Sequence, residues 1–532
     1  MSRIKLYDTT LRDGAQSEGI SYSLRDKMLI ARRLDELGLD YIEGGWPSNL
    51  KDEAFFRRMK AVRLKRACLV AFCATRRKGL SARGDKSLDN VLRAETAVVT
   101  VFGKSWDLHA RDVLKVSLSE NLKMISQTIR FLRRMGREVI YDAEHFFDGY
   151  KANPDYALRT IEAAAGAGCI NVTLCDTNGG TLPDELVRII GQAKRRIAIP
   201  LGIHCHNDLG LAAANSLLAL GAGVGLVQGT FNGYGERCGN ADLTTIIGVL
   251  KTKMGIDCIG DEQLKGLTAA AYFISEISNA RLDPRQPFVG GAAFAHKGGV
   301  HIDAIRKNPR TYEHILPEKV GNRRRLLVSE LCGKTPILIK ARELNLELDK
   351  RSPQAKKILE LLQRLEHKGY QFEAAEASFE ILVKKALKRY KSFFDLESFR
   401  VIIEKRRNGR VVSEATIKLR VNNSEEHTTA EGDGPVNALD NALRKALREF
   451  YPQLSRMRLC DFKVRVLDDA RPGLRGQKRS GTAARVRVLI ESKDEKDSWR
   501  TVGVSENIIE ASWQALVDSV EYKLLKDGNL SR

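Results

Sequence analysis

The chain has 532 residues, and its 88 Lys+Arg against 67 Asp+Glu give a formal net charge of +21 at pH 7. Its 43% hydrophobic and 29% charged residues are ordinary for a globular protein and exclude a disordered chain. No uninterrupted apolar run reaches the roughly 18–20 residues that span a bilayer, and the N-terminus lacks the apolar segment of a signal peptide. We therefore expect a cytoplasmic protein without a membrane partner.

The positive charge raises the question of nucleic-acid binding, because clustered Lys and Arg side chains bind phosphate. The basic residues are scattered through amphipathic segments such as 24–34, which is typical of solvated helix faces. The sequence also shows no basic and aromatic interleaving, so we expect no nucleic-acid partner. Its nine cysteines form no C-x-x-C pair, and we expect reduced thiols.

Up to about residue 255, short apolar runs alternate with longer helical patterns. The predicted strands are 4–11, 41–45, 68–73, 98–103, 139–144, 170–177, 201–208 and 227–233. Apolar strands that alternate with helices form a parallel sheet covered by helices. About eight such units in about 250 residues are what a (β/α)8 barrel requires. We therefore predict an α/β fold with a catalytic TIM barrel over residues 1–275.

The alternation stops after the barrel. Residues 276–395 start with an extended, proline-containing stretch and continue with helical patterns at 355–367 and 373–390, which predicts a linker and a helical accessory subdomain. Residues 396–532 repeat one pattern twice, in which strands precede a helix. The strands are 399–405 and 414–421 before helix 438–450, and 462–467, 484–492 and 501–504 before helix 508–525. This predicts an internally duplicated α+β domain, with a basic loop at 469–479.

Two histidines at alternate positions of the seventh predicted strand indicate a metal site. His204 and His206 face the same side, because side chains alternate along a strand, and they lie at the rim where a barrel keeps its active site. The alternative is that the two histidines are structural or lie on the surface. The polar residues Arg12 and Asp13, which follow the first strand at the same rim, disfavour this alternative. We predict Asp13 as the third ligand and Asn240 as a further oxygen ligand. Oxygen ligands such as these favour Mg²⁺ or Mn²⁺.

Other polar residues at strand ends suggest a substrate. Arg12 beside a metal suits a 2-oxo acid, because a guanidinium pairs with carboxylate or ketone oxygen while the metal polarises the carbonyl. Glu144 is either a general base or a buried partner of Arg12. Glu43 is expected to hold Arg12 within the substrate site. Thr177 either offers its hydroxyl to a substrate carboxylate or caps the end of its strand.

Three long motifs carry a resemblance to a known family. They are Asp8–Gln16, His204–Asp208 and Asn232–Ala241. Together they are similar to the metal-dependent Claisen-condensing barrels, the 2-isopropylmalate, homocitrate and citramalate synthases. Gly298–Ala304 and Val320–Lys334 are similar to the accessory subdomain of that family, and residues 396–532 to its allosteric, dimer-forming domain. The resemblance covers essentially the entire chain.

This resemblance implies an acyltransferase that converts an acetyl group into an alkyl group on transfer. Tyr141–Tyr150 and Trp499–Asn507 look most like the citramalate-forming members, which implies that acetyl-CoA as co-substrate condenses with pyruvate and water in the first step of isoleucine synthesis. His301 and Tyr312 are then expected to help bind acetyl-CoA or assist thioester hydrolysis, with simple packing as the alternative for Tyr312. Isoleucine is the expected feedback effector, and a homodimer the expected assembly.

Two alternatives use the same barrel. A 2-isopropylmalate synthase takes 2-oxoisovalerate, and each added methylene changes discrimination by only about 1–3 kcal/mol, so the sequence separates this substrate from pyruvate poorly. A lyase runs carbon–carbon cleavage, which the long accessory and C-terminal regions disfavour because such a lyase needs only the barrel. The sequence departs from many relatives at Ala15, where they have Glu, and at Cys332, where they have Ser.

Overall fold

The computed structural model describes residues 3–327, 353–467, 484–495 and 497–529. It divides into two compact units, Met1–Ala295 with Glu313–Arg325, and His296–Tyr312 with Leu326–Arg532. No helix in the described ranges combines the length and apolar character needed to cross a membrane. The cysteines in these ranges are all free thiols. The predicted loop at 469–479, the end of the motif Val320–Lys334 and Cys332 lie outside the described residues.

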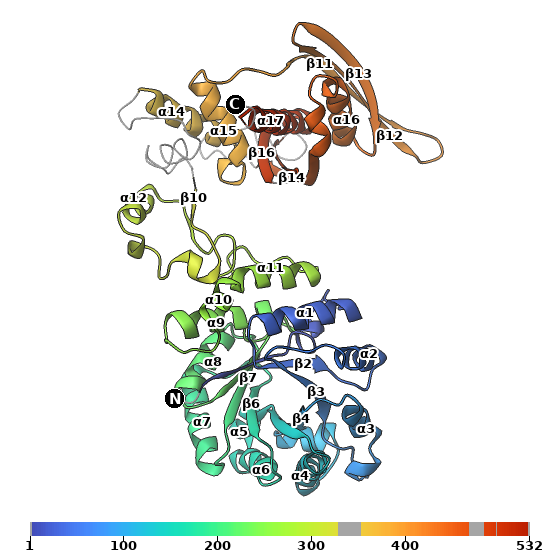
Figure 1. The fold of residues 1–532 in the computed structure, drawn as a ribbon, viewed down its shortest axis with the longest axis vertical. Coiled ribbons are helices and arrows are strands. Elements are labelled where there is room, and N and C mark those ends of the chain that lie inside the picture. The colour runs from blue at the N-terminus through green and yellow to red at the C-terminus, as the bar shows by residue number, and fades with distance from the viewer. Residues whose placement is uncertain (1–2, 328–352, 468–483, 496, 530–532) are drawn as a thin grey trace, which may run out of the picture. The chain divides into compact units, whose positions relative to one another are not determined.

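The first unit contains a closed barrel of the parallel strands β1–β8, which confirms the predicted (β/α)8 fold (Figure 1). The strands are β1 Lys5–Asp8, β2 Tyr41–Gly45, β3 Cys68–Ala74, β4 Val98–Lys104, β5 Glu138–Glu144, β6 Asn171–Asp176, β7 Leu201–Cys205 and β8 Leu226–Gly229. β1 pairs with both β2 and β8, which closes the barrel. β2, β6 and β7 are buried along their whole length, as expected where helices cover a parallel sheet.

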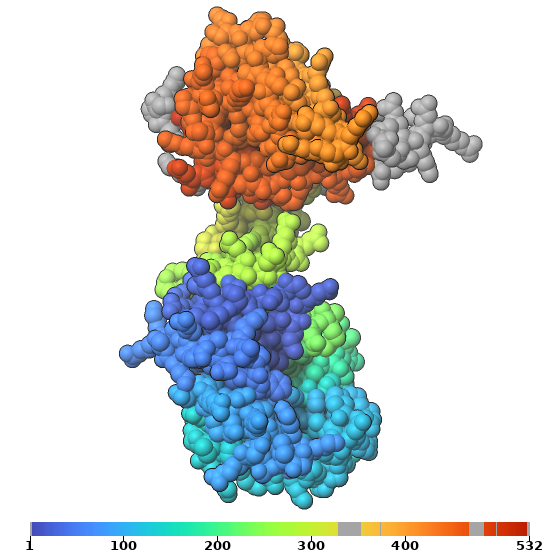
Figure 2. Space-filling model, turned by 90° about the vertical axis from the view of Figure 1, so that its right-hand side faces the viewer, coloured from blue at the N-terminus to red at the C-terminus, as the bar shows by residue number. Residues whose placement is uncertain are grey.

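Helices surround the barrel on its outside. They are α1 Leu24–Glu36, α2 Leu50–Met59, α3 Lys86–Arg93, α4 Leu118–Arg134, α5 Phe146–Ala152, α6 Pro154–Ala165, α7 Pro183–Arg196, α8 Ala212–Gly221, α9 Leu243–Thr252, α10 Asp261–Lys265 and α11 Leu267–Ile277. In α1, the Ser23 and Asp26 side chains each accept a hydrogen bond from the other's backbone N–H, which caps the helix. Ile30 and Leu34, one turn apart, are fully buried. Figure 2 shows that residues from the N-terminal part of the chain, coloured blue, form much of the visible surface of this unit.

Three barrel strands end at least three residues earlier than predicted, on the side of the barrel that carries the site. One of them is β8, which ends at Gly229 and not at residue 233, because a 3-10 turn follows at Phe231–Gly233. β1 ends at Asp8, because the Asp8 carboxylate accepts hydrogen bonds from the backbone N–H and the hydroxyl of Thr10 and turns the chain. β7 ends at Cys205 and not at residue 208. His206 nevertheless forms an isolated antiparallel bridge with Asn240, which keeps its backbone extended.

The second unit contains helices and the predicted duplication. The helices α12 Gly299–Lys307, α14 Pro353–His367 and α15 Glu376–Ala386 precede two three-stranded antiparallel sheets. The first repeat is β11 Asp395–Lys405, β12 Val411–Val421, β13 Ser424–Gly432 and α16 Pro435–Leu447; the second is β14 Arg458–Leu467, β15 Arg485–Lys493, β16 Ser498–Ser505 and α17 Ile508–Asn529. This repeat confirms the internal duplication. Leu443 of α16, Trp499 of β16 and Leu516 of α17 share one hydrophobic core.

The sequence prediction missed β13, the third strand of the first repeat. Its residues are mostly polar and none is fully covered, so it lacks the apolar alternation that identifies a strand. It pairs with β12 through a two-residue turn at Asn422 and Asn423, whose φ angles are 47° and 72°. Asparagine tolerates this left-handed conformation and is favoured in such hairpin turns, so the Asn-Asn pair was the available signal.

Candidate metal centre and active site

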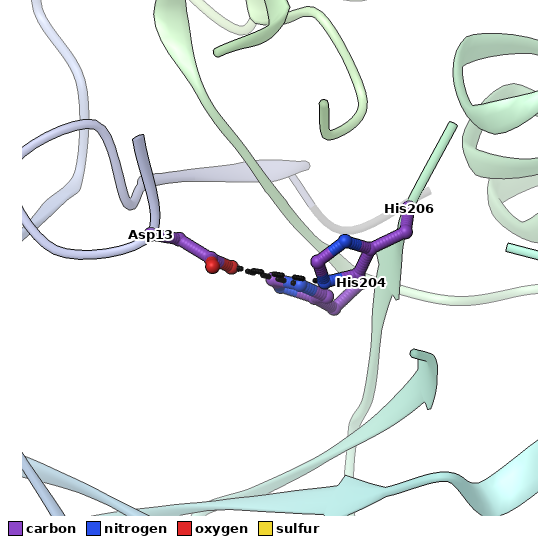
Figure 3. Close-up of side chains that lie close together, drawn as sticks. All are labelled: Asp13, His204 and His206. Atoms are coloured by element: carbon purple, nitrogen blue, oxygen red, sulfur yellow. Dashed lines mark ion pairs between the residues drawn. The ribbon is translucent and has the colours of Figure 1, made fainter. Parts of the chain in front are cut away.

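Asp13, His204 and His206 converge at the end of the barrel where the strands finish (Figure 3). All three side chains are buried, and their ligand atoms lie within 4.8 Å of one another. Asp13 Oδ2 is 3.2 Å from Nε2 of His204 and 4.0 Å from Nε2 of His206. Two imidazole nitrogens and a carboxylate oxygen form a donor set for a divalent cation that leaves coordination positions for a substrate.

Asn240 adds a buried amide to this cluster. Its Nδ2 lies 3.0 Å from Asp13 Oδ2 and 3.1 Å from His204 Nε2. Its Oδ1 has no hydrogen-bond partner among the described residues, and leaving such a group unpaired costs about 1–3 kcal/mol. A half-turn of the amide exchanges the two atoms and brings the oxygen to face Asp13 and His204. The cluster therefore fits a cation, with Asn240 as a ligand in that second orientation.

The pKa values of the three side chains suit a bound cation. Burial raises the pKa of Asp13, but the Arg12 charge and His204 outweigh it, so the net pKa lies well below the usual range. Burial and then the His204 charge lower the pKa of His206 to about 3, so its ring is neutral. Burial lowers the pKa of His204 too, yet its hydrogen bond with Asp13 outweighs this, and the net pKa is raised. A metal that binds the ring of His204 therefore competes with a proton.

Arg12 is held beside the cluster by acidic and aromatic side chains. Its Nε donates to Glu43 Oε1 at 2.5 Å, and its Nη1 lies 3.4 Å from Asp13 Oδ1. Glu43 is fully buried and also accepts a hydrogen bond from the Tyr7 hydroxyl at 2.6 Å. The guanidinium carbon lies 4.0 Å from the centre of the Phe72 ring. Glu43 and Phe72 therefore determine the plane of the guanidinium.

Glu144, the last residue of β5, forms an ion pair with Lys104, the last residue of β4. The acidic side chains in contact with Arg12 are Glu43 and Asp13. This arrangement favours the general base over the buried Arg12 partner among the two roles predicted for Glu144. The role itself stays a prediction.

Thr177 follows β6 and is tied to the end of β5. Its Oγ1 accepts a hydrogen bond from the backbone N–H of His145 at 2.9 Å. His145 adopts a left-handed backbone conformation with φ 56° and ψ 34°, which costs a non-glycine residue about 1–3 kcal/mol. The chain thus holds a strained residue next to Glu144, and its N–H reaches the Thr177 hydroxyl.

His301 and Tyr312 belong to the second unit. Their rings stack with centroids 4.2 Å apart. Tyr312 is 47% exposed, so its ring is only half covered by packing. The predicted role of this pair towards acetyl-CoA stays a prediction, as does simple packing for Tyr312.

The sequence prediction missed the buried polar residues next to the metal ligands. Gln228 Oε1 lies 2.9 Å from His204 Nδ1, and Gln228 Nε2 donates to Asp142 Oδ1 at 2.8 Å. Burial, with the charge of Glu43 as the next cause, raises the pKa of Asp142 to about 7. The available signal was a polar residue inside an otherwise apolar strand, in Leu226–Gly229 and in 139–143.

Family models match three consecutive parts of the chain. Residues 3–270 match the HMGL-like family, 288–369 the homocitrate synthase post-HMGL domain-like family, and 373–524 the LeuA allosteric (dimerisation) domain. The matched regions follow one another through the barrel, the region after it and the duplicated domain.

Several relatives align with the chain over nearly its full length. It is 54% identical to the (R)-citramalate synthase of Geobacter sulfurreducens, covering 100% of this chain and 99% of the relative. It is 52% identical to the (R)-citramalate synthase of Aquifex aeolicus, covering 99% and 98%. It is 29% identical to the 2-isopropylmalate synthase of Methanocaldococcus jannaschii, covering 98% and 95%.

Proposed function

The chain belongs to the HMGL-like family and to its (R)-citramalate synthases, and we propose that it condenses acetyl-CoA with pyruvate and water to give (R)-citramalate and CoA. The observation that carries this chemistry is the buried cluster of Asp13, His204 and His206, with Arg12 beside it. The identity of 54% to a citramalate synthase, against 29% to a 2-isopropylmalate synthase, supports pyruvate over 2-oxoisovalerate. The product serves isoleucine synthesis.

Asp13, His204 and His206 would hold Mg²⁺ or Mn²⁺, with Asn240 as a further ligand in its rotated orientation. Such an ion, when bound, polarises the ketone of a 2-oxo acid and attracts its carboxylate. The buried, neutral ring of His206 and the low pKa of Asp13 keep both groups in the protonation states that bind a cation.

Arg12 and Thr177 position the oxo acid. The Glu43 carboxylate and the Phe72 ring hold the guanidinium of Arg12, which donates hydrogen bonds to the ketone oxygen as negative charge develops on it. Thr177 uses a lone pair to accept from His145, so its own O–H donates to the substrate carboxylate.

Glu144 is the proposed general base. Its carboxylate, held by Lys104, takes a proton from the methyl group of acetyl-CoA, and the resulting carbanion attacks the ketone carbon of pyruvate. A carbon–carbon bond forms, the ketone oxygen gains a proton, and water then cleaves the thioester to release CoA. His301 and Tyr312 are proposed to hold acetyl-CoA or to assist this hydrolysis.

The C-terminal domain is proposed to bind isoleucine as a feedback effector and to form a homodimer. The match to the LeuA allosteric (dimerisation) domain supports both roles. A cavity of about 750 Å³ lies between α16 and the start of β14. Val436 and Phe462 give it apolar walls, and Asp440 and Arg448 give it both charges. This lining suits an amino acid with an apolar side chain.

The product of the reaction tests this function. The full chain is incubated with acetyl-CoA, Mg²⁺ or Mn²⁺, and pyruvate, 2-oxoisovalerate, 2-oxobutyrate or 2-oxoglutarate in turn, and the product is identified by chiral chromatography with mass spectrometry. We expect (R)-citramalate from pyruvate as the main product. Exclusive formation of 2-isopropylmalate would assign the chain to that alternative, and cleavage of an added hydroxyacyl-CoA without condensation would assign it to the lyases.

A further inference from the structure

We propose that Gln228 is a positioning residue that decides which nitrogen of His204 binds the metal. This inference rests on the proposed metal centre. Gln228 of β8 stands directly opposite His204 of β7 in the sheet register, so both side chains point to the same side of the sheet. Gln228 is fully buried, and its Oε1 lies 2.9 Å from Nδ1 of His204.

Neighbouring residues determine how the Gln228 amide is turned. Thr173 Oγ1 donates to Asn171 Oδ1 at 3.2 Å, so it presents its lone pairs to Gln228. Gln228 Nε2 donates to Thr173 Oγ1 at 3.2 Å and to Asp142 Oδ1 at 2.8 Å. With Asp142 ionised, the reverse orientation would set the amide oxygen against these two acceptors. The amide therefore directs its oxygen towards His204.

This orientation determines the tautomer of His204. An amide oxygen only accepts hydrogen bonds, so Nδ1 of His204 carries a hydrogen. In a neutral imidazole the other nitrogen then keeps its lone pair. That nitrogen, Nε2, faces Asp13 Oδ2 at 3.2 Å. Gln228 thus presents the lone pair of His204 to the place where the donor atoms converge, in the manner of partners that orient metal-binding histidines.

The two histidines differ in this respect. Nδ1 of His206 has no hydrogen-bond partner among the residues that the structure describes. Of the two histidines, therefore, only His204 has its Nδ1 held by a buried side chain, that of Gln228. The effect of changing Gln228 should be specific to His204 and should appear first in metal affinity.

Mn²⁺ binding to the full chain, measured by electron paramagnetic resonance of free Mn²⁺ from pH 6 to 9, tests the proposal. Gln228→Met keeps the side-chain length but removes the acceptor, and we expect it to weaken binding about 10–100-fold. Gln228→Glu keeps the acceptor for Nδ1, with a proton shared between its second oxygen and Asp142 in place of the amide hydrogen bond, and should weaken binding less than Gln228→Met does. Thr160→Val, which removes a buried hydroxyl of α6 that is hydrogen-bonded to Ser105 and to the Ala157 carbonyl, is the control and should leave affinity unchanged.

Equal affinity of Gln228→Met and the unaltered chain would overturn the inference and leave the proposed function standing. Absence of Mn²⁺ binding by the unaltered chain would overturn both. If Gln228→Met does not fold, nitrogen-15 histidine spectra of the unaltered chain in Mg²⁺ decide. Protonated Nδ1 and unprotonated Nε2 on His204 support the assignment, and the reverse overturns it.

Discussion

The backbone N–H of His145 donates a hydrogen bond to Thr177 Oγ1 at 2.9 Å, across the ends of two neighbouring barrel strands. His145, directly after Glu144, has a left-handed backbone conformation at this bond. It couples the proposed base and the proposed carboxylate-binding hydroxyl through one peptide segment.

Replacing Thr177 with Val should lower kcat/KM for pyruvate. A hydrogen bond to a charged group is worth about 1.5–3 kcal/mol, which corresponds to a loss of roughly 10–150-fold. Thr177→Ser keeps the hydroxyl and should retain most of the activity. Steady-state kinetics with varied pyruvate measure both variants. A valine variant with unchanged kcat/KM would assign Thr177 to strand-end capping alone.

Replacing Glu144 with Gln should lower kcat by about 10²–10⁴-fold, because the proposed base is removed while the shape of the side chain is kept. Exchange of the acetyl-CoA methyl hydrogens with deuterated water should fall in parallel. Glu138→Gln, at the exposed start of the same strand, is the control and should change neither. Undiminished exchange in Glu144→Gln would place the base elsewhere.

Asp518 should make the C-terminal domain less stable at high pH. Its carboxylate accepts a hydrogen bond from Ser378 at 2.6 Å, and burial raises its pKa from 3.8 to about 6, with Lys385 and Glu521 nearby. A raised pKa in the folded state favours the protonated form. The resulting stability is complete below about pH 3.8 and is lost as pH rises through about 6.

Asp518→Asn keeps an acceptor for Ser378 and removes the buried charge. At pH 8 its free energy of unfolding should exceed that of the unaltered chain by about 1–3 kcal/mol, so it should unfold at a higher temperature. At pH 5 this difference in stability should be smaller. Thermal unfolding of both full chains at the two pH values measures this. A gap of equal size at pH 5 and pH 8 would show that Asp518 is ionised throughout.

Isoleucine should inhibit the unaltered chain, and Phe462→Glu should remove this inhibition without changing kcat in its absence. The change places a charge on an apolar wall of the cavity between α16 and β14. Arg406→Gln, in the β11–β12 turn outside that cavity, should remain sensitive. Inhibition of Phe462→Glu equal to that of the unaltered chain would place the effector elsewhere.

The sequence predicted those features that depend on local spacing. The alternation of His204 and His206 put both rings on one side, and the Arg12-Asp13 pair identified the exit of the first strand. The alternating strands and helices predicted the barrel, and the repeated order of strands and helix predicted the duplication, both of which the structure confirms.

The features that the sequence did not predict depend either on the register between neighbouring strands, which pairs residues far apart in the sequence, or on a weak sequence pattern. Gln228 meets His204 only because β7 and β8 align these two positions. Lys104 meets Glu144 through the pairing of β4 with β5. β13 is polar, and its only strong signal is the turn that precedes it. Such contacts follow from the folded sheet and not from spacing along the chain.

The proposed reaction is the condensation of acetyl-CoA with pyruvate at the Asp13, His204 and His206 centre. The most direct measurement is kcat/KM for release of CoA thiol with pyruvate and with 2-oxoisovalerate, before and after chelation and in His204→Ala. We predict that pyruvate is preferred and that either chelation or His204→Ala abolishes the activity. Added Mn²⁺ should restore the activity of the chelated, unaltered chain but not that of His204→Ala. Preference for 2-oxoisovalerate would contradict the substrate, and full activity after exhaustive chelation and in His204→Ala would contradict the metal centre.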